Sequence, residues 1–266
     1  MTDRQLTEKI AETVKEAGKI ILSASGTDYG TDSKQGHANY VTKYDRKVQE
    51  FLHERLSSLL PEASFLGEEE GEDVFREKYR KGWLFIVDPI DGTTNFIKGY
   101  YASTVSVGLF KDGKPYIGVI YQPYLDHIFT ACRGCGAFDN GKKIMSSSLP
   151  LCDSIIAFGT SPYRTDLWQK TMKLAGEYLM KGQDLRRSGS AAWDCCMVAC
   201  GAAGLYFEFS LGLWDYAAGA VIIREAGGVI TDIYGDELKF DGPSSVLAYG
   251  RGIDPAELVY PERSNA

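Results

Sequence analysis

The chemistry of this chain centres on two aspartates that stand just before a hydroxyl-rich turn, in the stretch WLFIVDPIDGTTNF at residues 83–96. Residues 84–87 form an apolar run that predicts a strand buried on both faces. Asp88 and Asp91 follow, where a proline and a glycine favour a turn. Two carboxylates three residues apart repel each other unless a cation lies between them, and Mg²⁺ or Ca²⁺ prefers oxygen ligands. The motif therefore predicts a metal site.

Gly92, Thr93 and Thr94 continue the motif with successive backbone N–H groups and two hydroxyls. Such groups bind a phosphate where a helix or a tight turn begins. Aspartate and threonine are also ordinary turn and N-cap residues, so the motif alone is compatible with a purely structural turn. The choice depends on acidic residues elsewhere in the chain.

Two further acidic motifs accompany the first. Upstream, GEE occupies residues 67–69, and downstream, WDYAAG at residues 214–219 places an aspartate at the expected start of an apolar helix. Together with DPIDGTTNF at residues 88–96, these motifs make the chain similar to the inositol monophosphatase family of metal-dependent sugar phosphatases. The resemblance runs nearly from end to end. It implies a phosphomonoesterase that uses two or three Mg²⁺ ions and a direct attack by water.

The resemblance also implies a set of metal ligands. Glu68, Asp88 and the carbonyl of Ile90 match the ligands of a first ion. Asp88, Asp91 and Asp215 match those of a second, so that Asp88 would bridge the two ions. An acidic run such as residues 68–70 is more often a solvated surface, and the resemblance is what favours Glu68 as a ligand.

A second set of matching positions implies how the attacking water is held. Asp45 lies at the start of a helix predicted over residues 48–59, where an N-cap is its ordinary role. The family pairs this aspartate with the first threonine of the turn to orient the attacking water. Together with the expected metal ligand Glu68, the candidate catalytic residues are therefore Asp45, Thr93 and Glu68. Lys34 matches a lysine in a metal-side loop and is otherwise an ordinary surface lysine.

The substrate-facing positions come from the C-terminal half. The resemblance implies that Glu208 binds the hydroxyls of a polyol, and an acidic side chain among aromatic residues suits that role; the alternative is a surface residue on an edge strand. Gly212 stands near a position that the animal enzymes fill with histidine, so the preferred sugar is left open. The complete set of expected substrate contacts is Asp91, Gly189, Ser190, Ala191, Glu208 and Asp215.

Hydrophobic periodicity predicts two halves. An amphipathic helix over residues 6–21 opens the first, and strands at 104–110, 116–121 and 127–131 with an Asn140-Gly141 hairpin complete it. The second half alternates strands and helices. We expect an α+β subdomain with the metal and phosphate site at residues 1–145, and an α/β subdomain with the substrate-side residues at 146–266. The family implies alternating α-β-α-β-α layers, the sugar phosphatase fold, and often a homodimer.

Composition excludes several classes of function. The 266 residues carry a net charge of −7 without a polybasic run, which argues against nucleic acid as a partner. No apolar stretch approaches the length of a membrane span, and the N-terminus lacks a signal-peptide pattern, so we expect a cytoplasmic protein. The six cysteines suit reduced thiols better than a disulfide framework. Cys132 and Cys135 form a CxxC pair beside the hairpin, and no second pair follows to complete a zinc site.

Three alternatives stay open at this point. Within enzymes, related families act on fructose 1,6-bisphosphate, histidinol phosphate or nucleotides, although Thr94-Asn95 stands where nucleotide-acting relatives often carry Lys-Glu. A non-catalytic regulatory or scaffold protein would keep the fold and bind an RNA or protein partner. A Ca²⁺-dependent binding module would use the acidic loops structurally and release no phosphate.

Overall fold

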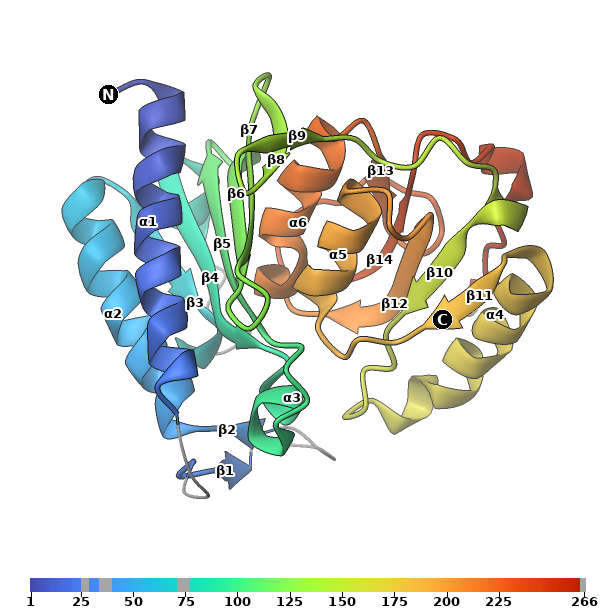
Figure 1. The fold of residues 1–266 in the computed structure, drawn as a ribbon, viewed down its shortest axis with the longest axis horizontal. Coiled ribbons are helices and arrows are strands. Elements are labelled where there is room, and N and C mark those ends of the chain that lie inside the picture. Colours follow the sequence, from blue (N-terminus) through green and yellow to red (C-terminus); the bar gives the residue numbers. More distant parts are fainter. Residues whose placement is uncertain (25–28, 34–39, 71–76, 264–266) are drawn as a thin grey trace.

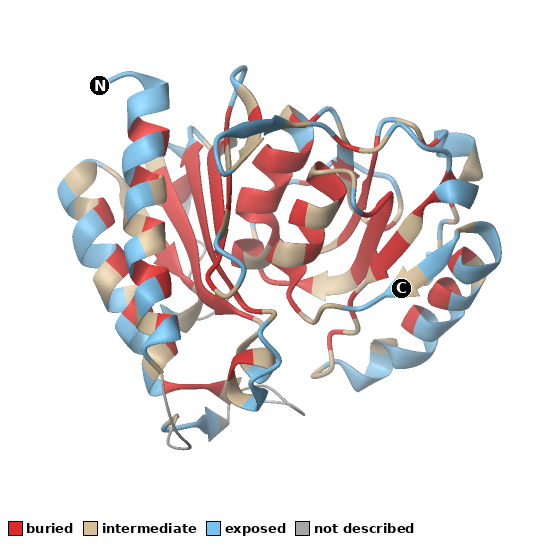
Figure 2. Ribbon diagram, viewed as in Figure 1, coloured by how far each residue is buried: buried red, intermediate tan, exposed pale blue. Residues whose placement is uncertain are grey.

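The protein forms alternating layers of helices and sheets, in the order α-β-α-β-α (Figure 1). The structure is a computed structural model that describes residues 1–24, 29–33, 40–70 and 77–263. Figure 2 shows that the two sheets and the helices between them are largely buried, whereas the outer helices bury one face each. The layered sandwich expected from the resemblance is confirmed.

The first sheet has seven strands in the order β3-β4-β5-β6-β7-β8-β9. Only the β3–β4 pair is parallel within this sheet, and the remaining pairs are antiparallel, in agreement with the expected meander. Its strands are β3 (Ser64–Gly67), β4 (Trp83–Asp91), β5 (Thr104–Lys111), β6 (Lys114–Gln122), β7 (His127–Cys132), β8 (Gly136–Asp139) and β9 (Lys142–Ile144).

The outer face of this sheet is covered by α1 (Asp3–Leu22) and α2 (Lys43–Leu59), which begin and end close to the predicted limits. Apolar residues at helical spacing in both helices pack against the inward side chains of β4, β5 and β6. Because the opposite face of β4 is covered as well, its apolar run is unbroken instead of alternating with polar residues.

The second sheet has five strands in the order β11-β10-β12-β14-β13. Helix α4 (Trp168–Lys181) covers its outer face through Leu174, Ala175 and Tyr178. The strands are β10 (Ile155–Phe158), β11 (Asp184–Arg186), β12 (Leu205–Leu211), β13 (Val229–Thr231) and β14 (Ser244–Tyr249).

Helices α5 (Ala191–Ala199) and α6 (Leu213–Glu225) fill the space between the two sheets (Figure 1). Helix α6 is apolar nearly all round, as a helix covered on every side must be. It lies close to the first sheet because Gly108 and Gly118 present no side chain: a Cβ at Gly118 would lie 2.4 Å from the carbonyl oxygen of Ala218. This close packing fixes the height of α6 above strands β5 and β6.

The remaining elements are short. Strands β1 (Asp32–Ser33) and β2 (Tyr40–Val41) pair next to α3 (Thr93–Lys98), and single 3₁₀ turns follow at residues 68–70, 77–80, 151–153, 165–167 and 255–257. One local difference from expectation concerns β4, which continues through Asp91 with a register shift after Asp88. The backbone is thus bulged between the two aspartates, and the strand ends at Asp91, directly before Gly92.

The division of the chain at residue 145 stays a prediction. Within the described ranges, no helix combines the length and the apolarity that a membrane crossing requires.

Candidate active site and metal centre

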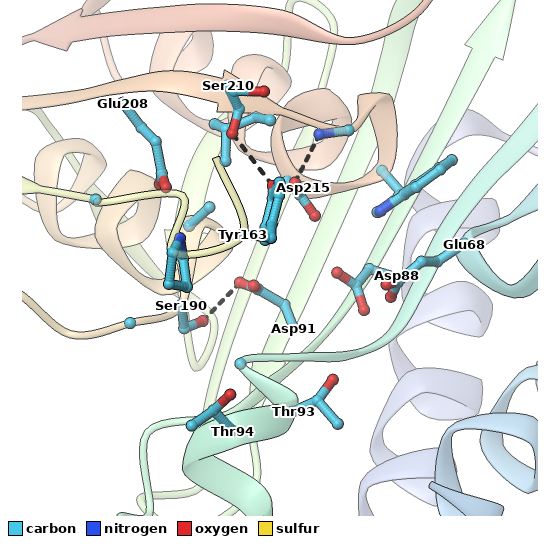
Figure 3. A pocket seen from close by; sticks show the side chains of 18 of the residues that line it. Glu68, Asp88, Asp91, Thr93, Thr94, Tyr163, Ser190, Glu208, Ser210 and Asp215 are labelled. Atoms are coloured by element: carbon cyan, nitrogen blue, oxygen red, sulfur yellow. Dashed lines mark hydrogen bonds between the residues drawn. The ribbon is translucent and has the colours of Figure 1, made fainter. Parts of the chain in front are cut away.

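A pocket of about 1090 Å³ opens where the end of β4 meets the starts of α5 and α6. Figure 3 shows acidic side chains on several of its walls, with Glu68 and Glu208 at opposite sides of the view and Asp91 between them. Thr93 and Thr94 lie on the first turn of α3 at its edge. The pocket therefore gathers residues from both sheets and from the central helices.

Three carboxylates form the centre of this pocket. Oxygen atoms of Asp88, Asp91 and Asp215 all lie within 4.8 Å of one another. Asp88 and Asp91 are almost fully buried, and Asp215 is partly exposed. Glu68, on the 3₁₀ turn after β3, and Ile90, between the two β4 aspartates, line the same pocket. The sequence-predicted ligands are thus together, although they come from positions 68 to 215 of the chain.

Backbone and side-chain donors hold each of the three carboxylates, and Asp88 accepts from the Ile90 backbone N–H at 3.0 Å. Asp91 accepts from the Ser190 hydroxyl at 2.6 Å and from the Ala192 backbone N–H at 2.7 Å. Asp215 is the third residue of α6, and its carboxylate accepts from the N-cap Gly212 N–H at 2.8 Å. These bonds leave further carboxylate lone pairs facing the pocket, since each carboxylate has about four.

The carboxylates resist ionisation when no cation is bound. Burial, followed by the charge of Glu68, raises the pKa of Asp88 well above its ordinary value. Burial raises the pKa of Asp91 to about 6, against the lowering effect of its hydrogen bonds. Burial and the charge of Asp91 also raise the pKa of Asp215. A divalent cation removes this conflict, so the oxygen-only donor set fits a hard metal ion such as Mg²⁺.

Asp45 lies behind Thr93 and does not line the pocket itself. Its carboxylate accepts from the backbone N–H of Thr42 at 2.7 Å and from the Thr42 hydroxyl at 2.5 Å. The Thr93 hydroxyl lies 3.3 Å from Asp45 Oδ1 and 3.1 Å from the Ile90 carbonyl oxygen. Burial raises the Asp45 pKa to about 7. Thr42, and not Asp45, is the N-cap of α2, with Asp45 completing the capping box as its third residue.

The turn after β4 is fixed by a left-handed glycine and an asparagine. Gly92 has φ of 86°, and an added Cβ would lie 3.1 Å from the carbonyl oxygens of Ala102 and Gly189. The Asn95 side-chain amide donates to the carbonyls of Ala102 and Ser188, both at 2.9 Å. These contacts join the turn to the segment before α5.

Glu208 is an interior residue of a central strand, not an edge residue. Strand β12 lies between β10 and β14, and only 8% of Glu208 is exposed. Its carboxylate accepts from the Tyr206 hydroxyl at 2.7 Å and from the N–H and hydroxyl of Ser161 at 2.8 and 2.9 Å. Burial raises its pKa above the ordinary value. Glu208 lines the pocket, as expected, while it anchors the loop that contains Ser161.

Gly189, Ser190 and Ala191 also line the pocket, at the N-terminus of α5. Ser190 is 1% exposed, and its hydroxyl donates to the Asp91 carboxylate (Figure 3). The hydroxyl proton is therefore used in this hydrogen bond and is not directed at a ligand. Lys34, the expected metal-side lysine, lies outside the described residues.

Sequence reasoning missed one wall of the pocket, formed by the loop at residues 159–164. Tyr163 on this loop lines the pocket, and its hydroxyl donates to the Ser210 carbonyl at 3.3 Å (Figure 3). Asp194, buried in α5, and Arg187 complete that side. A loop without a motif gives no signal in a single sequence, and Asp194 sits inside an apolar helix where nothing marks it as part of a site.

Comparison with known proteins gives a consistent result. A profile described as the inositol monophosphatase family matches residues 3–265. "Inositol monophosphatase 3" of Solanum lycopersicum is 37% identical over 236 residues, which cover 88% of each chain. "Nus factor SuhB" of Xylella fastidiosa is 36% identical over 230 residues, covering 85% of this chain and 82% of the relative.

A solved structure, the extragenic suppressor protein suhB of Bartonella henselae, has a TM-score of 0.82 and 34% identity, and the match covers 92% of this chain and 93% of that one. A layered fold with an acidic pocket and these relatives support a phosphatase. The chain belongs to the inositol monophosphatase family.

Proposed function

We propose that this protein is a Mg²⁺-dependent phosphomonoesterase that hydrolyses an inositol monophosphate or a similar polyol phosphate. The observation that carries the proposal is the cluster of Asp88, Asp91 and Asp215, whose oxygens lie within 4.8 Å of one another in a pocket edged by hydroxyl groups. Buried carboxylates this close together are costly without a cation, and a phosphate monoester in the same pocket would share that cation's charge.

The residues that would hold two or three Mg²⁺ ions are Glu68, Asp88, the Ile90 carbonyl, Asp91 and Asp215. When bound, Mg²⁺ supplies positive charge for the phosphate oxygens and lowers the pKa of a coordinated water. Hydrogen bonds from Ser190 and Ala192 to Asp91, and from the N-cap Gly212 of α6 to Asp215, keep these carboxylates in place before a ligand arrives.

The chain's own contribution to the attack comes from Thr93 and Asp45. The hydroxyl of Thr93 lies within 3.3 Å of the Asp45 carboxylate, which accepts its proton in a hydrogen bond. The Thr93 oxygen then accepts a hydrogen bond from the water on its pocket side and orients it towards phosphorus. The backbone N–H groups and hydroxyls of Gly92, Thr93 and Thr94 are proposed to bind the phosphate oxygens.

Recognition of a polyol is supported by the opposite wall. Glu208 keeps an acceptor site on Oε2 beside the bond from Tyr206, and a sugar hydroxyl is a suitable donor for it. The neighbouring Tyr163 offers an aromatic surface. By resemblance to the family, we also propose a homodimer that works in the cytoplasm.

The experiment that tests the function measures phosphate release from a panel of substrates, with Mg²⁺ and with EDTA. The panel contains myo-inositol 1-phosphate, fructose 1,6-bisphosphate, histidinol phosphate, NADP and 3′-phosphoadenosine 5′-phosphate. We expect the highest kcat/KM for the inositol phosphate and no turnover in EDTA. A higher kcat/KM for another compound would replace the substrate, and no turnover with any divalent metal would contradict the phosphatase assignment.

A second candidate is a regulatory role, which the relatives named Nus factor SuhB favour. This role does not exclude catalysis. A regulatory function without catalysis predicts that Asp88→Asn complements a deletion strain as well as the wild-type gene does. The phosphatase proposal predicts that this variant fails to restore the growth that depends on turnover.

A further inference from the structure

The CxxC pair lies in a tight turn at the far end of α6 from the pocket, between β7 and β8. The backbone N–H of Cys135 donates to the Cys132 carbonyl at 2.8 Å, and Gly134 has φ of 77°. This combination is a closed type II turn, in which the first and fourth Cα atoms lie less than about 7 Å apart. A disulfide accepts Cα separations of about 4.4–6.8 Å, so the backbone is already in range.

The two sulfur atoms are directed to the same place. Each Sγ lies 3.9 Å from the Arg133 carbonyl oxygen, the atom between them in the turn. A contact with the Cys135 thiol contributes to the high pKa of Cys132, which burial raises to about 12. The thiols therefore face each other and both are reduced in this structure.

The pair differs in accessibility. Cys135 is exposed to solvent, whereas Cys132 is 3% exposed and packs in the core beneath α1. The carboxylate of Glu225, the last residue of α6, accepts from the N–H groups of Gly134 and Gly136, both at 2.8 Å. This clamp holds the turn in one conformation, which keeps the two thiols close to each other.

We propose that Cys132 and Cys135 form a redox-active dithiol that exchanges with low-molecular-weight disulfides. The Cys135 thiolate attacks one sulfur of the small disulfide, breaks its S–S bond and releases one thiolate. The Cys132 sulfur then attacks the Cys135 sulfur, its proton passing to the thiolate already released, and expels the second thiolate, which takes up the proton that Cys135 gave to the solvent when it ionised. The external disulfide is reduced to two thiols, and the protein's two thiols are oxidised to one disulfide. The site is independent of the proposed phosphatase function.

The test incubates the whole protein with oxidised glutathione, quenches with acid, alkylates the remaining thiols and maps the peptides by mass spectrometry without reduction. We expect an internal Cys132–Cys135 disulfide that dithiothreitol reverses. Cys152 is the control within the same chain, since it is exposed and we expect it to retain a glutathione adduct. The proposal is overturned if Cys135 also retains glutathione while Cys132 is alkylated, or if both stay unmodified while Cys152 reacts.

Two variants separate the steps. With Cys132→Ala the mixed disulfide on Cys135 has no thiol to resolve it and should accumulate. With Cys135→Ser the entry thiol is gone, and the buried Cys132 should remain unmodified at exposures that modify Cys152. Circular dichroism checks that both variants are folded, and the wild-type result stands without them.

Discussion

At the scale of single residues, Asp91 and Asp45 show how one chemical group acquires two roles. Asp91 faces the pocket and accepts three hydrogen bonds, from Ser190, Ala192 and, at 3.5 Å, Thr104. Asp45 is fully buried and reaches the pocket only through the Thr93 hydroxyl. We propose that Asp91 binds a cation, whereas Asp45 holds the Thr93 hydroxyl.

Asp88→Asn should abolish nearly all turnover while the fold is kept. The amide has similar size but removes the charge at the centre of the acidic cluster, so several kcal/mol of transition-state stabilisation is lost, about 10³-fold in rate or more. Phosphate release and the circular dichroism spectrum check both parts. Glu62→Gln is the matched control, because it removes an exposed carboxylate and should leave activity unchanged. An active Asp88→Asn protein would contradict the assignment.

Thr93→Val and Thr94→Val separate two proposed roles within one turn. Thr93 bonds to Asp45 and the Ile90 carbonyl, so its loss should lower kcat by about 10²-fold, the usual scale for a group that assists proton transfer. Thr94 is exposed and proposed to contact phosphate, so its loss should mainly raise KM. Steady-state kinetics distinguish them. Equal losses of kcat in both variants would argue against a special role for Thr93.

At the scale of elements, three helices begin at the site and each donates backbone N–H to a carboxylate. The donors are the N-cap residue of α2 to Asp45, the second residue of α5 to Asp91 and the N-cap residue of α6 to Asp215, at 2.7, 2.7 and 2.8 Å. The positive ends of these helices favour negative charge nearby. Helix packing therefore offsets part of the repulsion that assembling the carboxylates creates.

The close packing of α6 against the first sheet should affect both the stability of the protein and the position of Asp215. Gly118→Ala would place a methyl group 2.4 Å from the Ala218 carbonyl oxygen and push the helix away. We expect a loss of about 1–3 kcal/mol in the free energy of unfolding and a lower kcat. Urea denaturation and phosphate release measure the two effects.

The matched control for this variant is Gly176→Ala in α4, where an added Cβ meets no atom within 4 Å. That change should stabilise the protein by about 0.5–1 kcal/mol, as alanine does in an open helix position. If Gly118→Ala were equally stabilising, the close packing of α6 on β6 would not limit the structure.

At the scale of the whole molecule, the pocket lies where the end of β4 in the first sheet meets the central helices α5 and α6 and strand β12 of the second sheet. Asp91 in the pocket and Asp45 behind it have raised pKa values, about 6 and about 7 respectively, against 3.8 ordinarily. The unfolded chain thus loses these protons at lower pH than the folded chain. Without metal, the contribution of these two groups to the free energy of unfolding is fully present below about pH 4 and is lost as the pH rises through 6 to 7.

Mg²⁺ should therefore stabilise the protein more at high pH than at low pH. We expect the rise in Tm on adding Mg²⁺ to be large above about pH 7, where the carboxylates need a counter-charge, and small below about pH 5, where protons occupy them. Thermal unfolding followed at both pH values, in Mg²⁺ and in EDTA, measures this. A rise in Tm of the same size at both pH values would show that Mg²⁺ binds elsewhere.

The layers, and the gathering of Asp88, Asp91 and Asp215, were predictable because three motifs make the sequence resemble the inositol monophosphatase family, which implies both. The interactions of Glu208 were not, because they depend on Ser161, a residue of a loop without a motif. The capping role of Thr42 was missed for a different reason. Thr42 and Asp45 are both typical N-cap residues and lie three positions apart, so the sequence alone does not show which of them is the N-cap. Local patterns specify elements, whereas contacts between loops require the packed molecule.

The hydrogen bonds from Ser190 and Ala192 to Asp91 have a consequence for protein synthesis. A ribosome makes the strand that carries Asp88 and Asp91 long before it makes α5 and α6, and the N-terminal part of a chain folds first. Until those helices emerge, the nascent chain contains Asp88 and Asp91 but lacks Asp215 and the donors that hold Asp91. Under the proposed mechanism, phosphatase activity could appear only after Asp215 has left the exit tunnel, and a chain terminated before that residue would be inactive.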